Sequence, residues 1–75
     1  MRETERDRLR ALGLNISYYR RLKGYSQVRC AELVGISRTH MSRIENADCA
    51  VSLDILFRIC DVLEISPSRM FDFGK

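Results

Sequence analysis

The chain has 75 residues, with 13 Lys or Arg against 10 Asp or Glu and a formal net charge of +3. This length predicts one small domain, residues 1–75, in which a single compact core supplies nearly all of the stability. The sequence has no apolar run near the roughly 20 residues of a membrane span, and its charged start lacks the apolar stretch of a secretory signal, so we expect a cytoplasmic protein without membrane contact.

The first predicted helix ends at Gly24, a residue type suited to a helix C-terminus. Its apolar side chains recur at helical spacing, at Leu9, Leu12, Ile16, Tyr19 and Leu22. Residues 1–8 alternate acids and bases, which predicts a charged extension that is a solvated or frayed first turn.

A short helix begins after Ser26, which is a natural N-cap. Val28, Ala31 and Val34 are spaced as its inner face. Gly35 ends this helix, because a residue without a side chain accepts a left-handed backbone at little cost.

A second short helix starts almost at once, with Ser37 as its cap. Met41 and Ile44 are its predicted buried positions, and Ile36 is expected to fill the angle between the two helices. The pair therefore forms a tight corner around Gly35.

Two more helices complete the chain. Ser52 caps a strongly apolar helix, and Ser66 with Pro67 opens a last short one. The predicted inward positions of the apolar helix are Leu53, Leu56, Ile59, Cys60 and Leu63. No segment alternates as a strand does, so the predicted fold class is all-α with five helices.

Several of these stretches together resemble the Cro/lambda-repressor (XRE-type) helix-turn-helix DNA-binding family, from about Leu12 to Phe71. They are Ser26-Gln27, Ala31, Val34-Gly35-Ile36-Ser37, Ser42-Arg43-Ile44-Glu45-Asn46 and Leu63-Glu64-Ile65-Ser66. The resemblance implies a five-helix lambda-repressor-like bundle with its helix-turn-helix at about 26–46. It also implies a sequence-specific transcriptional regulator.

In that architecture the second helix of the pair enters the major groove with its N-terminal residues foremost. The predicted base-contacting side chains are Arg38, Thr39, Arg43 and His40. Arg38 is the candidate for a bidentate contact to guanine O6 and N7. The alternative for all four is a solvated polar face.

The resemblance also implies contacts to the DNA backbone, which set position rather than sequence preference. Gln27, Ser37 and Asn46 are the predicted phosphate ligands. Arg20 and Glu45 match a family pair that forms a buried ion pair between the first helix and the recognition helix. The alternative for this pair is simple exposure, where it would contribute little.

One position departs from the family. Many members have glycine where Ala47 stands, so either this turn differs or Asn46 takes the left-handed conformation. The stretch Ala47 to Val51 contains no Arg or Lys, and we expect no DNA contact from it. A DNA-contacting basic arm in residues 1–8 is an alternative that the interleaved acids disfavour.

The expected partner is double-stranded DNA with a near-palindromic operator, bound by a homodimer, because one recognition helix covers only a few base pairs. Phe57, Phe73 and Met70 are the predicted dimer interface, whereas Phe71 is expected to close the bundle. A repressor of a mobile element and a controller of a restriction-modification operon fit equally well.

Three other functions compete with this interpretation. The first is a helical protein-interaction module such as an antitoxin. The second is metal or redox sensing through Cys30, Cys49, Cys60 and His40, whose separations match no close zinc pairing. The third is an enzyme, for which no nucleophile–base pair or carboxylate dyad is recognisable. We expect no cofactor, metal or small-molecule ligand.

Overall fold

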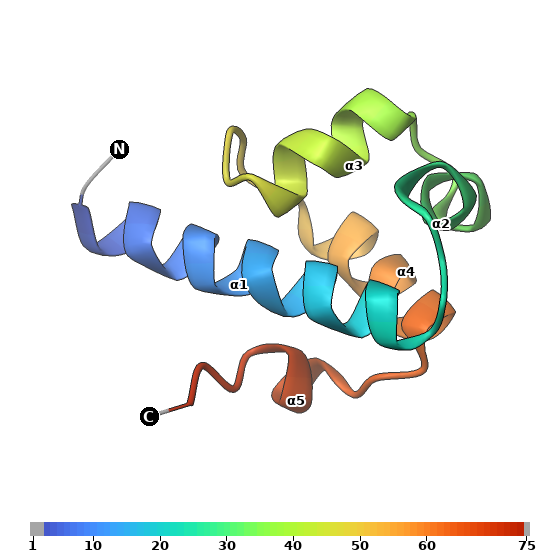
Figure 1. Ribbon diagram of the computed structural model, residues 1–75. Coiled ribbons are helices and arrows are strands. Elements are labelled where there is room, and N and C mark those ends of the chain that lie inside the picture. Colours follow the sequence, from blue (N-terminus) through green and yellow to red (C-terminus); the bar gives the residue numbers. More distant parts are fainter. Residues whose placement is uncertain (1–2, 75) are drawn as a thin grey trace.

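Five helices follow one another in the computed structural model, which describes residues 3–74 (Figure 1). The all-α prediction is confirmed. None of the helices in that range has both the length and the apolar character needed to cross a membrane. The helices are α1 (Glu3–Leu22), α2 (Gln27–Val34), α3 (Arg38–Glu45), α4 (Leu53–Leu63) and α5 (Pro67–Met70).

Serine caps define where four of the helices begin. The side-chain oxygen accepts a hydrogen bond from the backbone N–H three residues on at Ser26 (3.0 Å), Ser37 (3.0 Å) and Ser66 (3.3 Å). Ser52 occupies the same position before α4 but makes no such bond. Its side chain instead hydrogen-bonds to Asp54, which lowers the pKa of that carboxyl group.

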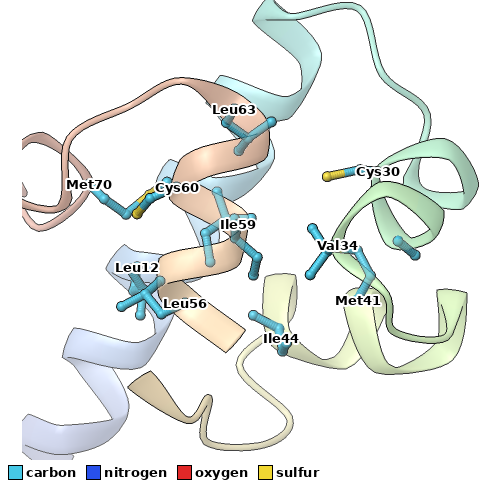
Figure 2. Close-up of a cluster of buried hydrophobic side chains, with 12 residues drawn as sticks. Leu12, Cys30, Val34, Met41, Ile44, Leu56, Ile59, Cys60, Leu63 and Met70 are labelled. Atoms are coloured by element: carbon cyan, nitrogen blue, oxygen red, sulfur yellow. The ribbon is translucent and has the colours of Figure 1, made fainter. Parts of the chain in front are cut away.

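The core gathers side chains from all five helices, and α4 packs against α1, α2 and α5 (Figure 2). Because these apolar positions recur about every third or fourth residue, each helix buries one face and leaves the other in water. The buried set is Leu12, Ile16, Cys30, Ala31, Val34, Met41, Ile44, Leu56, Ile59, Cys60, Leu63 and Met70.

Two predicted inward positions are wrong. Val28 is 49% exposed and Leu53 is 63% exposed. The buried arc of α2 is centred on Cys30, Ala31 and Val34, and a helix turns by about 100° per residue, so Val28 falls on the flank of that arc. Leu53 is the first residue of α4. The buried residues of this helix begin only at Leu56, one turn further along.

Met70 and Phe71 exchange the places that the sequence predicts for them. Met70, assigned to the dimer interface, is 0% exposed, and Phe71, expected to close the bundle, is 45% exposed. The reason is a backbone anchor: Asn15 Nδ2 donates to the carbonyl oxygens of Met70 at 2.8 Å and of Asp72 at 2.9 Å. This anchor holds the chain after α5 against α1 with Met70 turned inward.

The charged start of the chain is helical from Glu3 onward, so residues 3–8 belong to α1 and are not a separate extension. Residues 1 and 2 of the predicted extension lie outside the described residues. Glu3 and Glu5 stand in the first turn, where negative charge interacts favourably with the helix dipole. Asp7 and Arg10 form an exposed ion pair at 3.5 Å within the helix.

Two left-handed residues shape the chain on either side of α3. Gly35 has φ 90° and ψ 30° and donates its N–H to the carbonyl of Ala31 at 2.8 Å, as its predicted role at the corner requires. Ala47 has φ 58°, whereas Asn46 has φ −90°. The alternative in which Asn46 takes the left-handed conformation is therefore wrong.

Ala47→Gly is expected to stabilise the fold by roughly 0.5–1 kcal/mol. Glycine removes a left-handed strain of about 1–2 kcal/mol, and the freer unfolded chain offsets about 0.4–1 kcal/mol of that gain. Urea unfolding followed by circular dichroism measures the difference. Ala50→Gly, at an exposed alanine without a positive φ, is the control and is expected to destabilise. Equal effects of the two changes would contradict the strain at Ala47.

Candidate functional site

The corner between α2 and α3 positions the candidate site. Ala31 is 1% exposed, and its small side chain allows α3 to cross closely over α2. Ile36 packs partly buried against the core beside Gly35. Figure 1 shows α3 along the outer edge of the bundle, with α2 next to its N-terminal end.

One side of α3 faces solvent with two arginines. Arg38, Thr39 and Arg43 are exposed, and His40 is partly buried at the rim. Met41 at 0% and Ile44 at 3% exposure lie on the opposite, buried side, as predicted. We call Arg38, Thr39 and Arg43 the α3 outer face.

The side chains of the α3 outer face form no hydrogen bond or ion pair with any residue in the range 3–74. Two guanidinium groups thus have all of their donors directed to solvent. Holding such groups on a rigid helix without polar partners among the described residues adds no hydrogen bond or ion pair to the fold. It leaves planar donor forks available to an external acceptor.

Of the three residues predicted to contact phosphate, Gln27 begins the helix pair, Ser37 stands at the corner within it, and Asn46 follows its end. Gln27 is half-buried at the start of α2, and its Nε2 donates to Glu45 Oε1 at 3.1 Å. Ser37 is exposed, with its hydroxyl capping α3. Asn46 is exposed just after α3, and its Nδ2 contacts Ser42 Oγ at 3.4 Å.

Arg20 and Glu45 form a buried ion pair that joins α1 to the last residue of α3. Arg20 Nε lies 2.6 Å from Glu45 Oε2, and Nη2 lies 3.1 Å from Oε1. The residues are 7% and 9% exposed, and Arg20 Nη1 also donates to the carbonyl of Tyr25 at 2.8 Å. The hydrogen bond to Glu45 raises the pKa of Arg20. Each charge is thus compensated although both are removed from water.

Gly13 is a structural residue of the site that the sequence analysis does not identify. A Cβ atom added to it would lie 2.4 Å from the carbonyl oxygen of Glu45 and 2.9 Å from that of Ile44. Only glycine therefore lets α1 approach the last turn of α3 this closely. The one sequence signal is an isolated glycine inside a helical pattern, which often marks a close approach.

A second feature was missed in the N-terminal half of α1. Arg6 and Arg10 line a polar cleft of about 310 Å³ together with Asn46, Ala47 and Asp48. Arg6 belongs to residues 1–8, for which a solvated turn was preferred over a DNA-contacting basic arm, and Arg10 was assigned no role from the sequence. Their spacing of four residues, which puts both on one face of a helix, is the signal that was available.

The aromatic residues predicted for the dimer interface lie at the surface. Phe57 is 46% and Phe73 is 36% exposed. Phe71 and Phe73 pack edge to face, with ring centroids 6.4 Å apart. With Leu9, Leu12 and Ala50 they line an apolar groove of about 380 Å³ between α1 and the C-terminal segment.

The cysteines are free thiols. Cys30 and Cys60 are buried on different helices (Figure 2), and burial raises the pKa of both thiols. Both therefore stay protonated near neutral pH and pack as small apolar groups. Cys49 lies half-buried in the loop before α4.

Comparisons with known proteins agree with this geometry. A family model described as helix-turn-helix matches residues 9–70. The HTH-type transcriptional regulator SinR of Bacillus subtilis is 34% identical over 62 residues, which cover 81% of this chain and 56% of that protein. The antitoxin PezA of Streptococcus pneumoniae is 36% identical over 55 residues, which cover 73% of this chain and 35% of that protein. The chain thus spans a little more than half of SinR and about a third of PezA.

A solved structure is also similar. It is the restriction-modification controller protein C.AhdI from Aeromonas hydrophila, with a TM-score of 0.80 and 29% sequence identity. The match covers 83% of this chain and 94% of that one. The similarity therefore extends over nearly the whole controller chain and not over the helix pair alone.

Proposed function

Because the chain belongs to the helix-turn-helix family of the Cro/lambda-repressor (XRE) type, we propose that it is a cytoplasmic, sequence-specific transcriptional regulator that inserts α3 into the DNA major groove. It has no catalytic role in this proposal. The family consists of regulatory DNA-binding proteins, and the similarity to a regulator and to a controller protein supports the same assignment for this chain.

The observation that carries the proposal is the α3 outer face. Arg38 stands in the first turn of α3 with its donors unoccupied. A guanidinium there matches guanine O6 and N7, and a threonine beside it matches a thymine methyl group or a phosphate oxygen. Arg43, one turn further along, contacts a base or a phosphate.

Phosphate contacts flank these base contacts. The amide of Gln27 has two N–H donors, and Glu45 occupies one of them, which leaves the other for a phosphate oxygen. Ser37 and Asn46 contribute at the two ends of α3. Arg6 and Arg10, beside Asn46, extend the positive surface along the DNA backbone.

The protein acts as a homodimer on a near-palindromic operator in this proposal. Two recognition helices about 34 Å apart reach successive turns of the major groove. Phe57 and Phe73 are partly exposed, and we assign them to the dimer interface. Phe71, which is also partly exposed, replaces the buried Met70 in this assignment. In a dimer these rings are buried against the partner, whereas in a single copy their apolar surface stays exposed to water.

An antitoxin-like protein-interaction module is the second candidate, supported by the 36% identity to PezA. In that case the exposed aromatics form the main binding surface and the α3 outer face is of minor importance. The two functions differ in whether Arg38 controls DNA sequence preference.

Selection of bound duplexes from a random pool tests the proposal. We expect an inverted repeat with guanine in each half-site and binding that weakens steeply with salt. Arg38→Ala is expected to lose discrimination at that guanine by about 1–3 kcal/mol, whereas Gln27→Ala lowers affinity for all sequences alike.

Arg69→Ala is the matched control, because it removes the same charge from α5 on the other side of α1. It is expected to leave sequence preference unchanged. A pool that yields no enriched motif at low salt would contradict a DNA-binding role and favour the protein-interaction module.

A further inference from the structure

The polar cleft between the N-terminal half of α1 and the turn after α3 contains two arginines, both of them exposed. We call it the α1–α3 cleft, and its lining residues are Arg6, Arg10, Asn46, Ala47 and Asp48. Figure 1 shows the turn after α3 next to this half of α1. A neighbouring pocket of about 300 Å³ is also lined by Arg10 and Asn46 and reaches Glu45. Arg10 and Asn46 therefore lie close together at the C-terminal end of α3.

The geometry of α1 explains why both arginines reach this turn. Gly13 marks the closest approach of the two helices, since a Cβ atom there would lie 2.4 Å from the carbonyl oxygen of Glu45. Arg6 precedes Gly13 by seven residues and Arg10 precedes it by three, and residues at these spacings share one face of a helix. The face of α1 that packs on the last turn of α3 thus continues toward its N-terminus in two arginines.

The donors of the two guanidinium groups are largely uncommitted. The side chain of Arg6 forms no hydrogen bond or ion pair with any residue in the range 3–74. Arg10 pairs with Asp7 at 3.5 Å, but both side chains are more than half exposed, and such a pair contributes little. Three carbonyl groups at the end of α3 accept hydrogen bonds from the backbone N–H groups of residues 46–48. The arginines are therefore not required to cap α3.

Two residues that we expect to contact phosphate lie at the same end of α3 as the cleft. Asn46 lines it, and Gln27 is joined to Glu45 by a hydrogen bond of 3.1 Å. Asn46 follows Arg43 by three residues, so it continues the α3 outer face toward the cleft. Residues 47–51 include no Lys or Arg. At this end of α3, α1 therefore supplies the positive charge that the turn lacks.

We propose that the α1–α3 cleft binds two successive phosphates of the DNA backbone, beside the groove that α3 enters. Arg10 and Asn46 bind the first phosphate, and Arg6, one helical turn nearer the N-terminus, binds the second. Each guanidinium group offers a phosphate two parallel N–H donors. Arg10 exchanges Asp7 for the phosphate, and Asp48 limits the affinity because its carboxylate lines the same cleft. The inference rests on the proposed function and adds to it a specific contact from outside the helix pair.

The surroundings of the arginines favour a DNA strand over a small free anion. Both side chains are exposed to water, and the carboxylate of Asp48 repels a single anion that enters the cleft. A DNA strand presents phosphates at fixed intervals, and each phosphate that is neutralised releases condensed counterions. Two arginines one helical turn apart gain from both effects, because neighbouring phosphates reach them together.

Phosphate ethylation interference on the selected operator tests the proposal. Ethylation removes the charge of one phosphate, so it weakens binding wherever the protein contacts that phosphate. We expect two phosphates in each half-site whose ethylation weakens binding of the natural chain but not of the double variant Arg6→Ala with Arg10→Ala. In this variant the slope of log affinity against log salt is expected to fall by about 0.9 for each lost contact. Its affinity is expected to fall alike for all sequences.

Conservative changes separate a phosphate contact from a structural role. Arg6→Lys with Arg10→Lys keeps both charges and is expected to keep most of the salt slope. Asp7→Asn and Asp48→Asn each remove a competing carboxylate and are expected to raise operator affinity about two- to fivefold, the equivalent of one exposed ion pair. Urea unfolding of each variant gives the folded fraction, and affinities are compared per folded protein.

Arg69→Ala, which removes the same charge from α5, is again the matched control and is expected to leave the ethylation pattern unchanged. Two results separate this inference from the proposed function. If the Arg6→Ala, Arg10→Ala variant binds the selected operator with the ethylation pattern and salt slope of the natural chain, the cleft contact is overturned and the proposed function stands. If the natural chain selects no operator, both are overturned. Weaker binding that follows only from a smaller folded fraction would also overturn the cleft contact.

Discussion

Glu45→Ala is expected to destabilise the fold by about 3–5 kcal/mol, because it leaves the guanidinium of Arg20 buried without its counter-charge. The pair is held by two hydrogen bonds of 2.6 and 3.1 Å and is shielded from water, so solvent cannot replace the lost carboxylate. A small domain has only about 5–15 kcal/mol of stability in total. The variant is thus expected to be close to unfolding at room temperature.

Urea unfolding followed by circular dichroism measures this loss of stability. Two further variants show whether the unpaired charge or the lost packing causes it. Arg20→Met with Glu45→Met removes both charges and is expected to recover most of the stability, since an apolar pair of similar volume needs no compensation. Gln27→Ala removes only the neighbouring amide and is expected to have a small effect. A double variant as unstable as Glu45→Ala would show that packing, and not the unpaired charge, is responsible.

Gly13→Ala is expected to destabilise the fold by an amount near the upper end of about 1–3 kcal/mol, despite the gain of about 1 kcal/mol in helix propensity. The added methyl group would lie 2.4 Å from a backbone oxygen of α3, and a backbone oxygen cannot move without its helix. We therefore also expect weaker operator binding, because α3 must shift away from α1.

Gly24→Ala separates this clash from backbone strain. Gly24 has φ 82° and no atom within 4 Å of an added Cβ, so alanine there is strained by about 1–2 kcal/mol without touching α3. We expect it to lower the unfolding free energy and leave the operator affinity of the folded protein unchanged. Equal operator affinity for Gly13→Ala and the natural chain would show that α3 tolerates the displacement.

The Arg20–Glu45 pair and Gly13 differ in how far the sequence reveals them. The pairing of Arg20 with Glu45 could be predicted, because each residue matches a family position. The burial of the pair and its two hydrogen bonds are seen only in the folded chain. Gly13 is a lone glycine whose neighbours in space lie about thirty residues further along the chain. Nothing local to α1 tells it from a tolerated helix glycine.

The local structure can be predicted from the amino-acid sequence alone: serine caps at Ser26, Ser37 and Ser66, the left-handed corner at Gly35, and five helices with apolar spacing. Each of these signals involves residues within one or two helical turns, so it can be recognised without knowing how the rest of the chain folds. The outward position of Arg38 also follows, since Met41 and Ile44 define the buried side of the same helix.

Which side of a weakly patterned segment is buried becomes clear only when the helices are packed together. Cys30 lies inward where Val28 was expected, and Met70 is buried while Phe71 is exposed, because Asn15 anchors a backbone segment 55 residues away. Which side is buried depends on contacts between elements that are far apart in the sequence. The local spacing of apolar residues carries no information on those contacts. The same holds for Arg6, whose position beside the end of α3 follows from how the helices cross.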